Sequence, residues 1–163
     1  MVDCVLAGVG KAKRVADLFC GVGTFTFPLA RRARVLAVDA EEASVAALAA
    51  AARHARGLKP IETKVRDLFR VPLSAKELDG LDAVVLDPAR SGAEDQARQL
   101  ARSTVPVAIC VSCNPGTLAR DARILIDGGY TLESVTPIDQ FLYSHHVEAV
   151  AVLRRPGRSR PSP

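Results

Sequence analysis

Short apolar runs alternate with amphipathic segments along most of this 163-residue chain. The runs have the length of buried strands, and the segments between them have the spacing of helices. Strands are therefore expected at residues 14–19, 34–38, 59–65, 82–86 and 107–111. Helices are expected at residues 25–32, about 41–56, 93–102 and 115–127. This alternation predicts a doubly wound α/β fold, with an open and mostly parallel sheet covered on both faces.

The C-terminal pattern differs, because two apolar runs at residues 130–137 and 147–153 follow each other without a helix between them. They predict an antiparallel hairpin at one edge of the sheet. Gly128-Gly129 should end the preceding helix, since glycine accepts a left-handed cap. We expect one domain over residues 14–154, a lead-in or helix remnant over 1–13, and a disordered basic tail over 155–163.

Composition adds few constraints. Hydrophobic residues make up 48% of the chain, which suits a globular protein. The longest apolar stretch, residues 43–52, is rich in alanine and flanked by charges, so no membrane span is expected. The N-terminus lacks the pattern of a signal peptide, which predicts a cytoplasmic protein. The net charge of +4 suits contact with phosphate, but it is modest and lies partly in the tail.

The four cysteines do not suggest a disulfide framework. Cys110 and Cys113 form a C-x-x-C pair, but a redox pair needs accessible sulfurs and Cys110 lies inside an apolar run. Zinc would need a second cluster, and the three histidines offer no pair at ligand spacing. No metal or iron–sulfur site is therefore expected.

Cys113 falls between the apolar run 107–111 and a helix that Pro115 is well placed to open. The free N–H groups and the dipole at a helix N-terminus favour a thiolate at such a turn. A nucleophilic cysteine is one interpretation. A small buried hydrophobe is the alternative.

Polar groups cluster where the expected parallel strands end, at Phe19-Cys20-Gly21, Asp39, Asp67, Asp87 and Cys113. Ligands bind at the carboxyl ends of strands in this class of fold. Convergence of these groups on one edge therefore predicts a ligand site there.

The turn Gly21-Val22-Gly23 lets a ligand pass close to the backbone, and Asp39 is placed for a ribose diol. Thr26 stands where a dinucleotide fingerprint needs a third glycine, which disfavours a nicotinamide-dependent enzyme, and no P-loop lysine follows. The pattern therefore favours a nucleoside ligand without pyrophosphate, of which S-adenosylmethionine is the common example.

Four motifs resemble the signatures of the RNA 5-methyluridine methyltransferases. They are residues 17–25 (DLFCGVGTF), 86–92 (LDPARSG), 112–121 (SCNPGTLARD) and 145–148 (HHVE). The resemblance runs from about residue 14 to 153 and implies a class I S-adenosylmethionine-dependent methyltransferase fold. RNA cytosine-5 methyltransferases carry an extra cysteine after the proline of the second motif, and this chain has none.

The resemblance also implies roles. Cys113 would be the nucleophile that adds to carbon 6 of uracil, and Glu148 the base that removes the carbon 5 proton; without the resemblance, Glu148 would be an exposed charge. The cofactor would contact Phe19, Gly21, Gly23, Thr24, Asp39, Asp67 and Asp87. RNA would contact Arg90, Asn114 and His146, although Arg90 could equally brace its own loop.

Members of this family usually carry an N-terminal RNA-binding β-barrel, a central domain and a glutamine-containing cofactor segment. Residues 1–13 have no room for these parts. Thr24 also replaces an asparagine found in several relatives, a small polar exchange. We expect a catalytic domain acting on ribosomal or transfer RNA. The alternative is a non-catalytic fragment that binds S-adenosylmethionine or RNA.

Overall fold

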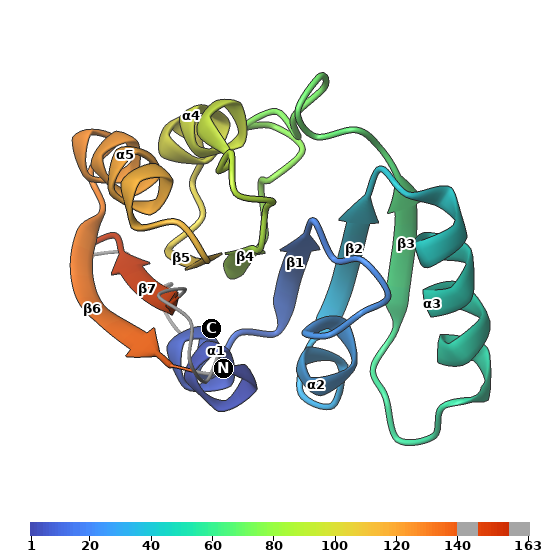
Figure 1. Ribbon diagram of the computed structural model, residues 1–163. Coiled ribbons are helices and arrows are strands. Elements are labelled where there is room, and N and C mark those ends of the chain that lie inside the picture. Colours follow the sequence, from blue (N-terminus) through green and yellow to red (C-terminus); the bar gives the residue numbers. More distant parts are fainter. Residues whose placement is uncertain (140–146, 157–163) are drawn as a thin grey trace.

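Five parallel strands and an antiparallel pair form the sheet of this protein (Figure 1). The computed structural model describes residues 1–139 and 147–156. Within them the strand order is β3-β2-β1-β4-β5-β7-β6. The strands are β1 (Arg14–Leu18), β2 (Arg34–Asp39), β3 (Ile61–Val65), β4 (Ala83–Leu86), β5 (Val107–Ser112), β6 (Thr131–Ile138) and β7 (Glu148–Arg154). The helices are α1 (Val2–Val9), α2 (Thr26–Ala30), α3 (Glu42–His54), α4 (Glu94–Arg102) and α5 (Pro115–Asp127).

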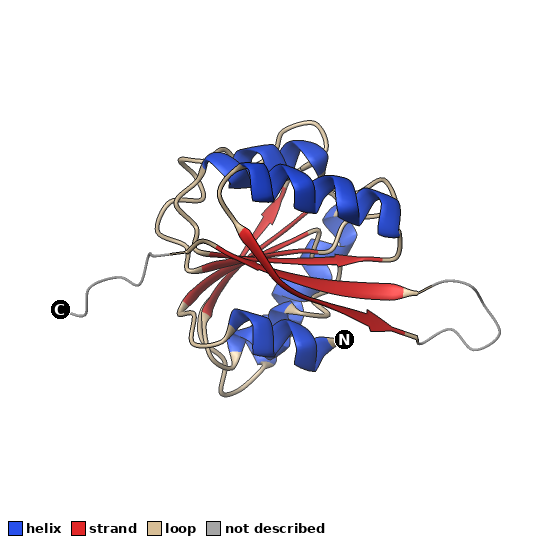
Figure 2. Cartoon of the chain, turned by 90° about the vertical axis from the view of Figure 1, so that its left-hand side faces the viewer, coloured by secondary structure: helices blue, strands red, loops and turns tan. Residues whose placement is uncertain are grey.

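Helices cover both faces of the sheet (Figure 2), which confirms the doubly wound α/β architecture. One buried cluster includes Leu100 of α4 and Leu125 of α5. A second joins Phe25 and Leu29 to Val5 of α1, so the expected lead-in contains a helix that packs into the core. None of the helices in the described ranges is long and apolar enough to cross a bilayer.

The predicted C-terminal hairpin is confirmed, and β7 lies between β5 and β6, antiparallel to both. The β5–β7 register pairs Cys110 with Ala151 and Ser112 with Ala149. The chain therefore enters β7 beside the point where it leaves β5. This register places Glu148 next to the turn that follows Ser112.

The end of α2 and the cap of α5 differ in detail from the prediction, although α5 itself ends at Asp127 as expected. Helix α2 stops at Ala30 because the chain tightens after it, with Arg32 and Ala33 both donating backbone hydrogen bonds to the Leu29 carbonyl. At the end of α5, Gly129 takes the left-handed conformation, with φ of 92°. Gly128 has φ of −79° and does not need to be glycine for its backbone angle.

Arg155, expected in a disordered tail, is instead bound to the ends of two helices. Its guanidinium donates to the carbonyls of Gly128 at 2.6 Å and Ala101 at 2.7 Å, and lies 4.2 Å from the Tyr130 ring centroid. Carbonyls at helix C-termini lack partners within the helix, and an aromatic face attracts a guanidinium. The expectation was therefore wrong at Arg155, and residues 157–163 lie outside the described chain.

The connection between β3 and β4, residues 66–82, contains no helix among the described residues. Hydrogen bonds and an ion pair hold this connection in place instead. The Arg66 guanidinium binds the carbonyls of Val71 and Pro72 and the Glu77 carboxylate at 2.6–2.8 Å. Gln96 of α4 accepts a hydrogen bond from the Leu73 N–H at 2.8 Å and donates one to its carbonyl at 3.0 Å. These contacts fix the segment that begins at Asp67.

Replacing Gln96 with alanine is expected to lower the free energy of unfolding by about 1–3 kcal/mol, because both buried backbone groups of Leu73 lose their partner. Urea denaturation measures the change. Gln99→Ala on the same helix is the matched control, since Gln99 accepts one hydrogen bond in a partly buried setting. Equal losses for the two variants would contradict this account.

Candidate active site

Cys113 lies where the sequence predicts it, in the turn between β5 and α5. Ser112 fixes this turn, since its hydroxyl accepts from the Asn114 N–H at 3.0 Å and donates to the Asn114 carbonyl at 3.1 Å. Asn114 caps the helix by accepting from the Gly116 N–H at 3.0 Å, and Pro115 opens the first turn. Cys113 is half-buried and free. Its thiol therefore stands at the positive end of a 13-residue helix.

Cys110, three residues earlier, is buried in β5. Burial, with a smaller contribution from the Asp121 carboxylate, raises the pKa of the Cys110 thiol to about 12. Burial likewise raises the pKa of Cys20 to about 12. Both stay protonated thiols at neutral pH, so C-x-x-C in this chain is not an accessible dithiol.

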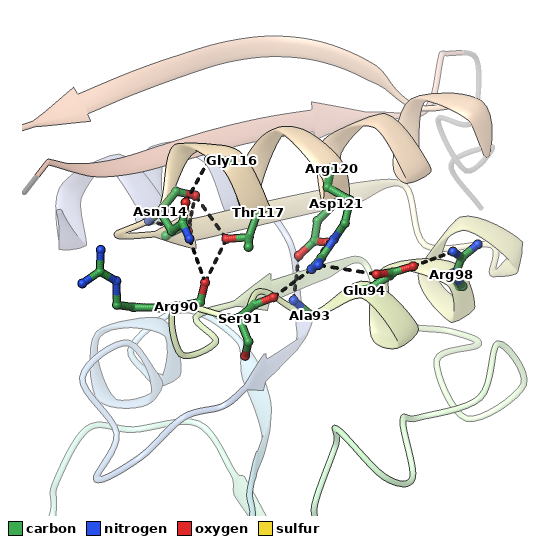
Figure 3. A network of polar contacts seen from close by, with 11 residues as sticks. Arg90, Ser91, Ala93, Glu94, Arg98, Asn114, Gly116, Thr117, Arg120 and Asp121 are labelled. Carbon is green, nitrogen blue, oxygen red and sulfur yellow. Dashed lines mark hydrogen bonds and ion pairs between the residues drawn. The ribbon is translucent and has the colours of Figure 1, made fainter.

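Hydrogen bonds tie the loop after β4 to the start of α5 (Figure 3). The Arg90 carbonyl accepts from the Asn114 side-chain amide at 3.1 Å and from the Thr117 hydroxyl at 3.2 Å. Asn114 was expected to contact RNA, and here both ends of its amide are engaged within the protein. The Arg90 guanidinium points away from the network in Figure 3.

The second turn of α5 completes this connection. The Asp121 carboxylate accepts from the Ala93 N–H at 2.6 Å, and Arg120 donates to the Ser91 carbonyl at 2.9 Å. Between them, Gly92 has φ of 76°, and a Cβ there would lie 2.5 Å from the Arg120 guanidinium. The loop carrying Asp87 and the turn carrying Cys113 are therefore held as one unit.

Glu148 lies beside the turn that carries Cys113, and its carboxylate is near enough to Asp87 to affect the Asp87 pKa. Glu148 begins β7 one residue before Ala149, the partner of Ser112. Burial raises the pKa of Asp87 to about 6, and the nearby Glu148 carboxylate adds to the shift. Asp87 and Cys113 thus follow the carboxyl ends of β4 and β5, and Glu148 lies at the entry to the neighbouring β7.

Asp17 opens the first motif, residues 17–25, but was not among the residues assigned to the cofactor site. It is fully buried in β1; one carboxylate oxygen accepts from the Thr26 hydroxyl at 2.5 Å, and the other has no partner in the described part of the chain. Burial above all, together with Asp87 and Asp39, raises its pKa to about 7. The available signal was a lone acid inside an apolar run.

Asp39 joins the end of β2 to the glycine turn. Its carboxylate accepts from the Gly21 N–H at 2.8 Å and the Glu41 N–H at 2.9 Å, which leaves lone pairs for further donors. A side chain at Gly21 would meet no atom within 4 Å. Gly21, with φ of 51°, and Gly23, with φ of 99°, both take the left-handed conformation, and at Gly23 a Cβ would also lie 2.9 Å from the Phe27 ring. The next residue, Thr24, is exposed.

Two aromatic rings flank this edge. Phe19 has φ of 63°, unusual for a residue other than glycine, and its ring centroid lies 5.1 Å from that of Phe69. Phe69 is 48% exposed, although it is a large apolar residue. Asp67 accepts from the Phe69 N–H at 2.9 Å and so positions this turn. The sequence did not identify Phe69, because its contact with Phe19 is long-range.

The structure therefore brings together most of the predicted site residues along the carboxyl ends of β1, β2, β4 and β5, where the strand arrows end in Figure 1. His146 lies outside the described residues. Among those described, no group of three or more histidine, cysteine or acidic side chains could hold a metal ion.

Asp17→Asn is expected to remove a pH-dependent cost of folding. Folded Asp17 keeps its proton up to about pH 7, whereas the unfolded chain loses it near pH 4. Its contribution to stability therefore falls as the pH rises from about 4 to 7. The unfolding free energy of the variant relative to wild type should rise by on the order of 2 kcal/mol between pH 5 and pH 8.

Urea denaturation at both pH values measures this difference. Asp95→Asn, at an exposed acid in the first turn of α4, is the control and should change little. Parallel pH profiles for Asp17→Asn and wild type would show that Asp17 does not titrate as described.

Comparison with known proteins supplies the family. The sequence profile of the tRNA (Uracil-5-)-methyltransferase family matches residues 1–156. An uncharacterized RNA methyltransferase of Agrobacterium fabrum is 59% identical over 155 residues, which cover 95% of this chain and 37% of that protein. The 23S rRNA (uracil(1939)-C(5))-methyltransferase RlmD of Aeromonas hydrophila is 40% identical, with 90% of this chain and 33% of that protein covered.

Among solved structures, the tRNA (uracil-54, C5)-methyltransferase of Pyrococcus abyssi, in complex with S-adenosyl-L-homocysteine, superposes with a TM-score of 0.78. It is 30% identical, and the match covers 93% of this chain and 36% of that one. The chain thus spans about a third of the length of these relatives. By the match over nearly its whole length, the chain belongs to the tRNA (Uracil-5-)-methyltransferase family.

Proposed function

We propose that this chain is the catalytic domain of an S-adenosylmethionine-dependent enzyme that methylates carbon 5 of uracil in RNA. The observation that carries the proposal is Cys113 at the N-terminus of α5, with Glu148 and Asp87 beside it. The family and the named activities of its relatives support the same reaction.

The carboxyl edge of the sheet fits S-adenosylmethionine. This cofactor carries ribose hydroxyls, an ammonium group and a positively charged sulfur. Asp39 offers free lone pairs, and Asp17 offers a buried oxygen without a partner. We assign cofactor binding to Phe19, Gly21, Gly23, Thr24, Asp39, Asp67 and Asp87. Once bound, the cofactor supplies a methyl group on an electron-poor sulfur.

Carbon 5 of uracil is a poor nucleophile, so the protein must first activate the ring. The Cys113 thiolate adds to carbon 6, forming a C–S bond and moving the electron pair into an enolate. Carbon 5 of the enolate would then accept the methyl group that the bound cofactor supplies, and the electron pair of the broken bond would remain with the cofactor's sulfur. The amino end of α5 stabilises the thiolate before addition.

Glu148 completes the reaction as a general base. It removes the proton from carbon 5, the ring double bond re-forms, and the C–S bond breaks to return the Cys113 thiolate. Asp87 would stand between the cofactor and Glu148, and the Glu148 carboxylate is near enough to contribute to its raised pKa.

RNA contacts are assigned to Arg90, Asn114 and His146, with ribosomal or transfer RNA as substrate. For Arg90 the support is geometric: its carbonyl is anchored by α5 while its guanidinium points away from the network (Figure 3). A guanidinium presented in this way suits a phosphate near the target uridine. Asn114 would act chiefly by holding that loop.

A second candidate is a fragment that binds S-adenosylmethionine or RNA without turnover. Its motivation is that the chain spans 37% of the Agrobacterium relative. Calorimetry with the cofactor, followed by a methylation assay on a broad RNA pool, separates the two candidates. Binding without methyl transfer supports the fragment, and measurable transfer eliminates it.

Substitution of the two catalytic residues should stop the reaction at different steps. Cys113→Ala should lower methyl transfer by at least about 10³-fold, because the nucleophile is lost. Glu148→Gln should lower turnover by about 10²–10⁴-fold but still allow one methyl transfer, so a covalent methylated RNA adduct accumulates. Radiolabelled methyl transfer and denaturing gels measure both effects.

Cys4→Ala is the control, since Cys4 is also a free, half-buried cysteine but lies in α1. It should keep wild-type turnover. Retained turnover in Cys113→Ala, or an adduct in that variant, would rule out the assigned nucleophile.

A further inference from the structure

The amino ends of β1, β2 and β3 carry a concentration of positive charge. These strands are neighbours in the sheet, and the chain enters each of them through a basic turn. The turns lie at the edge opposite the strand arrowheads, along the bottom of Figure 1. This basic edge consists of nine exposed residues, Lys11, Lys13, Arg14, Arg31, Arg32, Arg34, Arg53, Arg56 and Lys59.

Backbone hydrogen bonds join the three turns, so the charges are held close together. The Arg34 N–H donates to the Lys13 carbonyl at 2.8 Å, and the Lys59 N–H donates to the Ala30 carbonyl at 2.7 Å. Arg14 and Arg34 are also register partners on adjacent strands. Like charges at directly opposed positions of a sheet destabilise it, and a bound anion relieves that repulsion.

The whole positive excess of the protein comes from this edge. It holds nine of the 22 cations and four of the 18 carboxylates, namely Glu62, Glu77, Asp79 and Asp82, the last of which accepts hydrogen bonds from the Lys13 and Arg14 N–H groups. The rest of the chain has 13 cations, which include the tail arginines, and 14 carboxylates. From the sequence alone we expected a modest excess of positive charge, partly in the tail. The sequence does not show that the three basic turns before β1, β2 and β3 lie together.

The surface here is hollowed on both sides of the start of β3. Arg53 and Lys59 line one groove, and Arg14 and Arg34 line the other together with the carboxylates of Glu62, Glu77 and Asp79. Within the described ranges, Arg31, Arg34 and Arg53 form no ion pair with a carboxylate, whereas Glu77 is engaged by Arg66. Exposed arginines along a groove suit a phosphodiester chain.

The opposite edge is acidic. Asp17, Asp39, Asp67, Asp87 and Glu148 all lie at or near the carboxyl ends of the strands or the entry to β7. That edge attracts a cationic cofactor but repels the backbone of a polyanion. A long RNA therefore needs attraction from another surface to approach it.

We propose that the basic edge binds the phosphodiester backbone of the RNA substrate, roughly 20–25 Å from Cys113, because it lies one strand length along the sheet and two to four strand spacings across it. This rests on the proposed function for the identity of the RNA. One segment of the RNA is held at the amino edge while the target uridine enters at the carboxyl edge. Most of the binding free energy is then electrostatic and falls with salt.

The test compares two triple variants. Arg31→Gln/Arg34→Gln/Arg53→Gln removes charge from the basic edge, and Arg98→Gln/Arg102→Gln/Arg123→Gln removes three exposed arginines from α4 and α5. Fluorescence anisotropy with a labelled 40-nucleotide stem-loop RNA gives Kd between 50 and 200 mM NaCl. The basic-edge variant should raise Kd about tenfold or more and reduce the slope of log K against log salt by about 2.

The control triple should change Kd by less than about threefold, since its arginines lie outside the basic edge. Equal losses for the two triples, or no RNA binding by wild type, would overturn the proposal. Thermal unfolding monitors folding of each variant, and Arg34→Gln alone, with a smaller shift in the same direction, replaces a triple that does not fold.

Methylation kinetics separate this proposal from the proposed function. The basic-edge triple should raise KM for the 40-nucleotide RNA with little change in kcat, and leave methylation of a five-nucleotide uridine substrate unchanged. Loss of activity on the short substrate would overturn the proposal. If wild type methylates neither RNA, the proposed function fails, and the binding comparison still decides whether the basic edge holds RNA.

Discussion

The hydrogen bonds between α5 and the loop after β4 are the constraint on which the site depends. The Asp121 carboxylate accepts a hydrogen bond from the Ala93 N–H, and the side chains of Asn114 and Thr117 donate to the Arg90 carbonyl. The loop carries Asp87, and the turn before α5 carries Cys113, the proposed nucleophile. The β5–β7 register then adds Glu148 to the same place. Groups far apart in sequence thus share one rigid frame, which catalysis by positioning requires.

This frame gathers negative charge at a cost to folding. Asp17 and Asp87 both have raised pKa values, chiefly because they are buried. Carboxylates in such surroundings destabilise the folded chain, and sites shaped for ligands commonly carry costs of this kind. A cationic cofactor offsets the cost on binding. The acidic residues lie at the carboxyl edge of the sheet, whereas the basic edge lies at the amino ends of the strands.

Much of the fold and of the site could be predicted from sequence because the signals are local. Apolar runs marked the strands, and Pro115 after a strand placed Cys113 at a helix start. Other features depend on contacts between distant segments. Arg155 is bound by carbonyls at the ends of α4 and α5. The exposed Phe69 can be linked to the site only through the contact of its ring with that of Phe19. Spacing along the chain does not reveal such contacts.

The most direct test of the covalent mechanism uses RNA containing 5-fluorouridine. Fluorine cannot leave carbon 5 as a proton does, so the bond between Cys113 and carbon 6 should persist after methyl transfer. Mass spectrometry of the intact protein, incubated with S-adenosylmethionine and this RNA, should show an RNA adduct carrying one added methyl group, absent in Cys113→Ser. Methyl transfer without an adduct, or an adduct at another cysteine, would contradict the mechanism.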